Sequence, residues 1–358
     1  MSIYNYMCEL KKNFKSKFWY NVQSTGNCPL FQLFRLFILL SVSLLSACSV
    51  PEDAPEQRID LSVGGALSAD ILTSYDVGIV SSVNNGVKVW ELSTGQLKFD
   101  WRHEGDANNL VTKIDISADG LYAMTADREA FALWDLTVGE PVGFWRIDIA
   151  SIRDIAVSKK GETLLVGRGD GSVLLLNPKT GRRLEFMGHT EKINAVDLSP
   201  NGFYALTGSN DYTALLWDTR TAQVLRKFEH QSRVSMVGLD EYGRYAFTAD
   251  SKDHSKIWDI TTGQLISTLQ YFERQKIITA LKFSKDGKYL LTGSPSRALD
   301  LWDVQTGERL ARYKVGVHPD ASMPTAMVHS VDFMPDSEIP ASLSSSGFFE
   351  IWHKAIRH

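Results

Sequence analysis

The chain has 358 residues, of which 44% are hydrophobic and 22% are charged, and its 38 basic and 42 acidic side chains leave a net charge of −4. This is the composition of a globular protein. Residues 1–47 hold five basic residues and one acidic residue, so the remainder has 33 basic and 41 acidic residues and a net charge of −8. Phosphate binding needs a concentrated basic surface, so we predict no nucleic-acid partner.

Cysteine occurs only at Cys8, Cys28 and Cys48. The chain after Cys48 therefore has no internal disulfide, no cysteine nucleophile and no thiolate metal site. Burial and hydrogen bonding must hold the fold together.

An apolar run without charge extends from Leu36 to Val50, behind Arg35 and a lysine-rich segment. A membrane-spanning helix needs about 20 apolar residues, so this run of 15 is too short to span. Its length and its basic lead predict the core of a signal peptide.

The end of this run, Leu45-Ser46-Ala47-Cys48, resembles the lipobox of bacterial lipoproteins. The resemblance implies a signal peptide at 1–47, a lipidated Cys48 as mature N-terminus, and an acylated tether at 48–56. Ser49 after the cysteine implies sorting to the periplasmic side of the outer membrane in preference to the inner membrane. The alternative is an ordinary secretory signal, or a buried helix with an incidental cysteine. It leaves unexplained why charge and proline return at once in Pro51-Glu52-Asp53.

An internal repeat follows, marked by a tryptophan or its replacement every 41 to 50 residues. One marker is missing between Trp134 and Trp217. Gly202 precedes Trp217 by 15 residues, and the same spacing from Gly161 leads to Leu176. The seven markers are Trp90, Trp134, Leu176, Trp217, Trp258, Trp302 and Trp352.

Each unit is predicted to form four short strands. In the unit that starts at Ile193, the apolar segment INAVDLS is followed by the turn PNG and then by FYALTGS, TALLWD and QVLRKFEH. A Thr-Gly pair recurs four and five residues after several markers, where glycine suits the positive φ of a turn between strands.

These units resemble the WD-repeat β-propeller family, whose Trp-Asp signature stands at Trp134-Asp135, Trp217-Asp218, Trp258-Asp259 and Trp302-Asp303. The resemblance implies an all-β, seven-bladed propeller over residues 57–358. It also implies a structural hydrogen-bonded tetrad, complete only in one unit, formed by His189, Ser209, Asp211 and Trp217.

The last unit lacks its fourth strand, because only His353–His358 remain after Trp352. Arg58–Val63, before the first unit, is a spare strand. We predict that it completes the last blade and covers an otherwise exposed sheet edge.

No motif in the chain predicts catalysis. Gly167–Ser172 is rich in glycine but leads into a strand and lacks the Gly-Lys-Ser/Thr of a phosphate loop. The eight histidines show no close metal-ligand spacing, and no nucleophile elbow occurs. We therefore predict no catalytic residues, no metal and no cofactor, and a protein that is not an enzyme. Carboxylates that converge at the mouth of the ring remain possible.

The longest step between markers, 50 residues, places its excess in Lys314–Ser330. Long loops in compact repeats are functional or disordered. The candidate partner contacts in it are Val317, His318, Met323, Pro324 and Met327. The alternative is that Met327 and Val328 begin a strand and the rest is a solvated insertion.

The predicted function is a non-catalytic, membrane-anchored scaffold that binds protein partners of the bacterial cell envelope. The first alternative is a propeller that binds a ligand or carbohydrate, which would show clustered aromatic residues at the central mouth. The second is a propeller hydrolase or lyase, which would need convergent carboxylates or a metal.

Overall fold

The computed structural model describes residues 54–62, 64–83, 85–102, 110–147, 150–252, 254–271, 277–319 and 325–354. The chain divides into two compact units, Met1–Glu52 and Asp53–His358. The predicted signal peptide, Cys48 and most of the tether lie outside the described residues. Within the described part, no helix is long and apolar enough to cross a bilayer.

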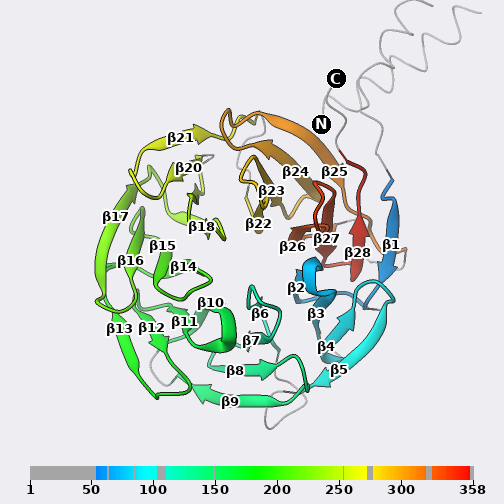
Figure 1. The fold of residues 1–358 in the computed structure, drawn as a ribbon, viewed down its shortest axis with the longest axis horizontal. Helices are drawn as coiled ribbons and strands as arrows, with labels where there is room; N and C mark the ends of the chain where they lie inside the picture. The colour runs from blue at the N-terminus through cyan, green and yellow to red at the C-terminus, as the bar shows by residue number, and fades with distance from the viewer. Residues whose placement is uncertain are drawn as a thin grey trace, which may run out of the picture. The chain divides into compact units, whose positions relative to one another are not determined.

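The described strands form seven antiparallel sheets of four strands each, arranged as the blades of a closed ring (Figure 1). The strands of a blade are named a to d from the axis of the ring outward. Blades 1 to 3 consist of β2 (Ser68–Leu72), β3 (Val77–Ser82), β4 (Gly86–Glu91) and β5 (Gln96–Trp101); β6 (Lys113–Ile116), β7 (Tyr122–Ala126), β8 (Ala130–Asp135) and β9 (Pro141–Arg146); and β10 (Ile152–Val157), β11 (Leu164–Arg168), β12 (Val173–Leu176) and β13 (Arg183–Phe186).

Blades 4 to 7 follow the same plan along the chain. They consist of β14 (Ile193–Leu198), β15 (Tyr204–Ser209), β16 (Thr213–Asp218) and β17 (Gln223–Glu229); β18 (Val234–Leu239), β19 (Tyr245–Asp250), β20 (Ser255–Asp259) and β21 (Leu265–Thr268); β22 (Ala280–Phe283), β23 (Tyr289–Gly293), β24 (Ala298–Asp303) and β25 (Arg309–Lys314); and β26 (Val328–Phe333), β27 (Pro340–Ser344), β28 (Phe348–Ile351) and β1 (Gln57–Asp60). Two short 3-10 turns, η1 (Thr73–Tyr75) and η2 (Lys159–Gly161), connect a to b in blades 1 and 3. The predicted seven-bladed fold is confirmed.

The core lies between successive blades, because each sheet packs both of its faces on its neighbours. Strand b is buried along its whole length in blades 1, 3, 6 and 7, which explains why its residues are apolar or small without alternation. Leu176 fills the place of the missing tryptophan in a core of aliphatic side chains and is 2% exposed.

The turns depend on glycine at the predicted places. Gly202, between strands a and b of blade 4, has φ 72°, and Gly307, between strands c and d of blade 6, has φ 71°. A side chain at Gly307 would collide with the carbonyl oxygen of Thr268 in the adjacent blade.

The N-terminal strand closes the last blade, as predicted. β1 pairs antiparallel with β28, with Gln57 opposite Ile351 and Asp60 opposite Phe348. Ile59 and Leu61 pack in the core shared by blades 1 and 7. The ring is therefore closed by strands from opposite ends of the propeller sequence.

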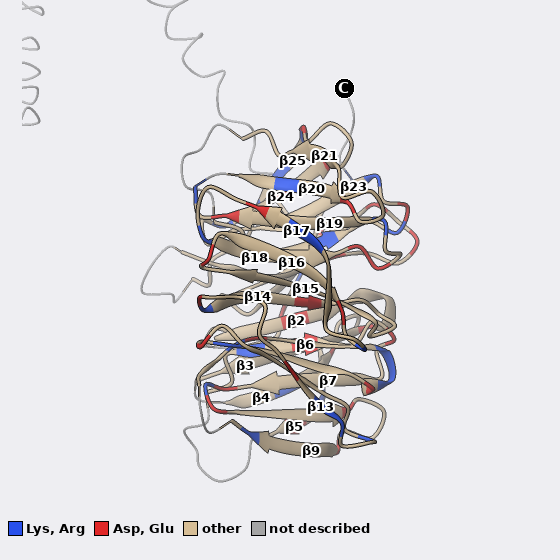
Figure 2. Ribbon diagram, turned by 90° about the vertical axis from the view of Figure 1, so that its left-hand side faces the viewer, with Lys and Arg blue, Asp and Glu red and all other residues tan. Residues whose placement is uncertain are grey.

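The ring has two rims, because strands alternate in direction within each blade. We call one the loop rim; it carries the b–c turns and the connections from d to the next a. We call the other the entry rim; it carries the a–b turns and the c–d turns, and the chain enters the ring there, where Glu56 N–H donates to the carbonyl of Ile351. Basic and acidic residues are interspersed over the turns at both rims (Figure 2).

Candidate functional site: loop rim and central channel

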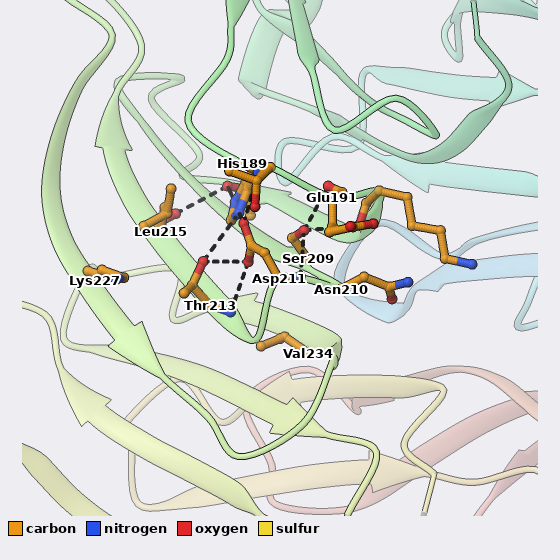
Figure 3. A network of polar contacts seen from close by, with 12 residues as sticks. His189, Glu191, Ser209, Asn210, Asp211, Thr213, Leu215, Lys227 and Val234 are labelled. Atoms are coloured by element: carbon orange, nitrogen blue, oxygen red, sulfur yellow. Dashed lines mark hydrogen bonds and ion pairs between the residues drawn. The ribbon is translucent and has the colours of Figure 1, made fainter.

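A buried polar network fixes the loop rim at blade 4 (Figure 3). His189 arrives from the connection between blades 3 and 4, and its side chain has no solvent exposure. Its Nδ1 lies 2.9 Å from Oδ2 of Asp211, and its Nε2 lies 2.9 Å from Oγ1 of Thr207. Burial lowers the pKa of His189 despite its contact with Asp211. The imidazole of His189 is therefore neutral, with Nδ1 donating to Asp211 and Nε2 accepting from Thr207.

Asp211 is ionised and holds the b–c turn. Although burial raises its pKa, the hydroxyl of Thr213 and the ring of His189 outweigh that effect and lower it. The carboxylate also accepts from the backbone N–H groups of Thr190 and Thr213. These contacts tie the connection between blades to the turn inside blade 4.

This geometry corrects the prediction that Ser209 is the hydroxyl residue of the tetrad. Its hydroxyl lies 2.8 and 3.1 Å from the carbonyls of Glu191 and Lys192, whereas Thr207 contacts His189. Because side chains alternate along a strand, Thr207 and Ser209 share a face and the sequence pattern fits either one. Thr207 makes the contact because it lies at the depth of the buried imidazole. Trp217 packs against Phe186 with ring centroids 4.2 Å apart, and its Nε1 is buried without a hydrogen-bond partner.

Blade 5 contains a second, partial network of the same kind. His230 Nε2 and Trp258 Nε1 each lie 2.8 Å from Oγ1 of Thr248. Asp250, rather than the aligned Lys252, lies nearest, with Oδ2 3.5 Å from Nδ1 of His230, but this nitrogen has no hydrogen-bond partner among the described residues. Oδ2 of Asp250 instead lies 3.0 Å from Nδ1 of His254. Burial lowers the pKa of His230 to about 4. A hydroxyl residue ten positions before the tryptophan is the sequence signal that identifies this network.

That signal recurs in other blades. Trp302 donates to Thr292 and Trp352 donates to Ser342, both ten residues earlier, and Trp134 donates to Thr125 nine residues earlier. In these blades the hydroxyl satisfies the indole N–H, as is usual for a buried tryptophan. The networks are structural supports for the loop rim.

The candidate contact loop is partly packed into the propeller. Val317 lies against the core between blades 6 and 7. Met327 is partly buried and lines the central channel. His318 stacks on Phe348 at 5.6 Å between ring centroids. Met323 and Pro324 lie outside the described residues.

The loop rim exposes other large apolar side chains that the sequence analysis did not select. Met187 is 78% exposed and Tyr212 is 53% exposed, and Tyr212 adopts a φ of 70° in its b–c turn. The exposed apolar residues of this rim are Val83, Leu110, Met187, Tyr212 and Ile277. They belong to blades or connections around most of the ring.

A cavity of about 490 Å³ occupies the centre of the ring and is lined by the innermost strands. Carboxylates converge there, as the enzyme alternative requires. Four of them, however, accept an N–H from the next blade: Asp70 from Ile116, Asp115 from Val157, Asp154 from Val196 and Asp197 from Leu239. Asp332, next to the lining residue Val331, makes the same link to Thr73, and Glu241, which also lines the cavity, pairs with Lys159. The carboxylates therefore act as links between blades.

These links have a signal that the sequence analysis missed, which is their distance from the marker tryptophan of the same blade. Asp70, Asp197 and Asp332 each precede the marker tryptophan by 20 residues, and Asp115 precedes it by 19. Lys282 has this position in blade 6. Burial lowers the pKa of Lys282, but the surrounding carboxylates, Asp332 first, outweigh burial and raise it.

Burial raises the pKa of Asp70 and Asp197 to about 6. It also raises the pKa of Asp115, which faces the charges of Asp70 and Asp197. Phe283 is the one aromatic ring among the residues that line this cavity, so the described channel lacks the aromatic cluster expected for carbohydrate binding. Among the described residues, no group of three or more His, Cys, Asp or Glu residues is placed to hold a metal ion.

Comparison with known proteins agrees with this architecture. Residues 181–218 and 263–303 match the model of the WD domain, G-beta repeat. The chain is similar to WD repeat-containing protein SL1-17 of Schistosoma mansoni, with 29% identity over 106 residues that cover 29% of this chain and 35% of that protein. It is also similar to the uncharacterized WD repeat-containing protein sll1491 of Synechocystis, with 33% identity over 95 residues that cover 26% of this chain and 27% of that protein.

The solved structures include a chain of similar fold in the crystal structure of the Mitotic Checkpoint Complex. The TM-score is 0.68 at 16% identity, with 85% of this chain and 93% of that chain covered. Matched segments span about a third or less of the curated relatives. The fold and the repeats together define this chain as a seven-bladed β-propeller that contains WD40 repeats.

Proposed function

We propose that this protein is a lipid-anchored, non-catalytic scaffold that binds a protein partner on its loop rim in the bacterial cell envelope. The main support for the proposal is that two large apolar side chains, Met187 and Tyr212, are exposed on the loop rim of a closed ring. Propellers with WD repeats typically serve as protein-interaction scaffolds. Buried networks at His189 and His230 hold the rim in one conformation, which lowers the conformational entropy lost on binding.

The exposed groups have the chemistry of a protein contact. Methionine adapts its shape to a partner, and tyrosine adds a large rigid area with a polar end. The loop at Lys314–Ser330 belongs to the same rim and includes the candidate contact His318.

The anchor completes the proposal. The lipobox-like end of the apolar run supports acylation of Cys48 and retention on the periplasmic side of the outer membrane. Fatty-acid labelling should disappear in Cys48→Ser, and labelling that persists in this variant would exclude Cys48 as the acylated residue.

The partner experiment uses a photocrosslinking residue at position 187 or 212 in cells, followed by affinity purification. The matched control position is Leu97, which is 46% exposed on the outer strand β5. We expect one discrete crosslinked protein from the rim positions and none from the control. Equal crosslinking from all three positions would contradict docking on the loop rim.

A further inference from the structure

The entry rim carries most of the exposed aromatic side chains of the described chain. Tyr75, Phe203, Tyr204 and Tyr242 lie in or beside its a–b turns, where Leu121 is also exposed. Tyr212 lies on the loop rim and Phe144 on the outer strand β9. The aromatic residues of the entry rim come from blade 1 and from the adjacent blades 4 and 5, so they lie at two separate places on the rim.

These rings are held in place. Tyr75 of blade 1 packs on Gly120 of blade 2, which has no side chain to displace it. The guanidinium of Arg220 lies 4.7 Å from the ring centroid of Phe203, and that of Arg244 lies 5.0 Å from the ring centroid of Tyr242. Aromatic rings beside guanidinium groups match the interfacial layer of a bilayer, where apolar ring bodies and polar groups find their preferred surroundings together.

Many charges of the entry rim are paired. Arg220 contacts Asp218, and Arg244 lies 2.7 Å from Asp240. The other ion pairs of this rim include Lys159 with Glu241, Lys285 with Asp336, Lys288 with Asp286 and Lys354 with Glu338. This pairing lowers the charge that the rim presents, so aromatic contact would contribute most to binding at a neutral bilayer.

The chain reaches the ring on this same rim. β1 begins at Gln57, and Ser49–Glu56 would separate it from a lipid on Cys48 by at most about 26–29 Å. Such a tether keeps the ring near the bilayer but leaves its tilt free. A second contact is needed to orient it, and the aromatic residues lie where that contact would form.

We infer that the entry rim rests on the bilayer through Tyr75, Phe203 and Tyr242, and that the loop rim thereby faces away from the membrane. This inference rests on the lipid anchor of the proposed function. It assigns the entry rim to lipid, with a neutral phospholipid surface sufficient for contact.

The test uses the acylated full-length protein on phosphatidylcholine vesicles that contain a nitroxide-labelled lipid. Residues 57–358 hold no cysteine, so one engineered cysteine can carry a fluorophore. Tyr242→Cys reports on the entry rim and Tyr212→Cys on the loop rim; the native side chains are 56% and 53% exposed, which makes the pair matched. We expect quenching at position 242 and no measurable quenching at position 212.

Two further measurements separate rim contact from the tether. Adding Tyr75→Ser and Phe203→Ser to Tyr242→Cys should abolish the quenching while the circular dichroism spectrum stays unchanged. Added phosphatidylglycerol or salt should leave the quenching unaltered. Equal quenching at positions 242 and 212, or quenching that survives the serine substitutions, would overturn the inference.

A surrogate anchor distinguishes failure of this inference from failure of the proposed acylation. Six histidines inserted between Val50 and Pro51 of a chain with Cys8→Ser, Cys28→Ser and Cys48→Ser would hold the protein on vesicles with nickel-chelating lipid. Quenching at position 242 but not at 212 supports rim contact whether or not Cys48 is acylated in cells. Equal quenching at both positions on this anchor refutes rim contact without bearing on Cys48.

Discussion

Arg58 and Glu350 form the ion pair that fastens the first strand of the propeller to its last blade. Nε and Nη2 of Arg58 lie 2.8 and 2.7 Å from Oε1 of Glu350. The side chain of Glu350 is completely buried, and the N–H of Gly316 also donates to it. Burial raises the pKa of Glu350, against the opposing effects of Gly316 and Arg58. The closure of the ring thus combines a backbone ladder with an ion pair between the buried Glu350 and the partly exposed Arg58.

Arg58→Ala should lower the free energy of unfolding by about 2–4 kcal/mol, because it leaves a buried carboxylate without its cation. Urea unfolding measures this change. The control is Lys285→Ala, which removes a pair whose side chains are 75% and 86% exposed and should leave the free energy of unfolding nearly unchanged. Equal effects from both variants would show that the buried pair does not fasten the blade.

Removal of β1 should have a larger effect than loss of the pair. A chain that begins at Gly64 loses several backbone hydrogen bonds, each worth about 0.5–1.5 kcal/mol, and exposes the edge of β28. It also loses Ile59 and Leu61 from the core. We expect a strongly reduced melting temperature and aggregation by light scattering. Unchanged melting would mean that the ring closes without this strand.

Thr207→Val and Ser209→Ala distinguish the two hydroxyls of blade 4. Thr207→Val leaves Nε2 of His189 without a partner and should cost about 1–3 kcal/mol. It should also shift the ring nitrogen resonances of His189 in NMR spectra. Ser209→Ala should leave those resonances in place, because its hydroxyl bonds to backbone carbonyls. A larger shift from Ser209→Ala would restore the predicted role of that serine.

Asp197→Asn tests the links in the channel through their pH dependence. Burial raises the pKa of Asp197 to about 6 in the folded protein, against an ordinary value of 3.8, so the folded state binds the proton more tightly than the unfolded state. Ionisation of Asp197 therefore costs stability above pH 6, and that cost disappears as the pH falls towards 4. The asparagine variant keeps an acceptor for the N–H of Leu239 but does not titrate.

Between about pH 7.5 and 4.5, the stability of the wild type relative to Asp197→Asn should rise by about 1–3 kcal/mol. Urea unfolding at both pH values gives this difference. His230, with its lowered pKa, acts in the opposite direction in both proteins and cancels in the comparison. A difference that does not change with pH would show that Asp197 ionises normally in the channel.

The long loop of blade 7 is expected to contain two functionally different parts. Replacing Pro319–Pro324 with a short glycine-containing turn should leave melting nearly unchanged but weaken capture of the crosslinked partner. Val317→Ala should lower the free energy of unfolding by about 1–2 kcal/mol, since Val317 packs on the core. Partner capture that is unaffected by the shortened loop would assign docking to Met187 and Tyr212 alone.

The sequence by itself determined the number of blades and the closure of the ring. Both depend on local chemistry that repeats: a tryptophan at a fixed distance from a turn glycine, and a spare strand at one end where the other end lacks one. Leu176 shows the strength of the periodicity, because spacing alone located the third blade without its tryptophan.

Only the tertiary structure decided which side chains meet. Thr207 and Ser209 both lie on β15, and the depth at which His189 enters the blade decided which of the two hydroxyls contacts it. Asp70 and Asp197 come from different blades, and their shared environment in the channel arises only when the ring closes. Val317 was predicted to be free for a partner, but packing between blades 6 and 7 covers part of it. Periodicity is a local property of the chain, whereas contact, burial and charge depend on residues that the ring brings together from distant repeats.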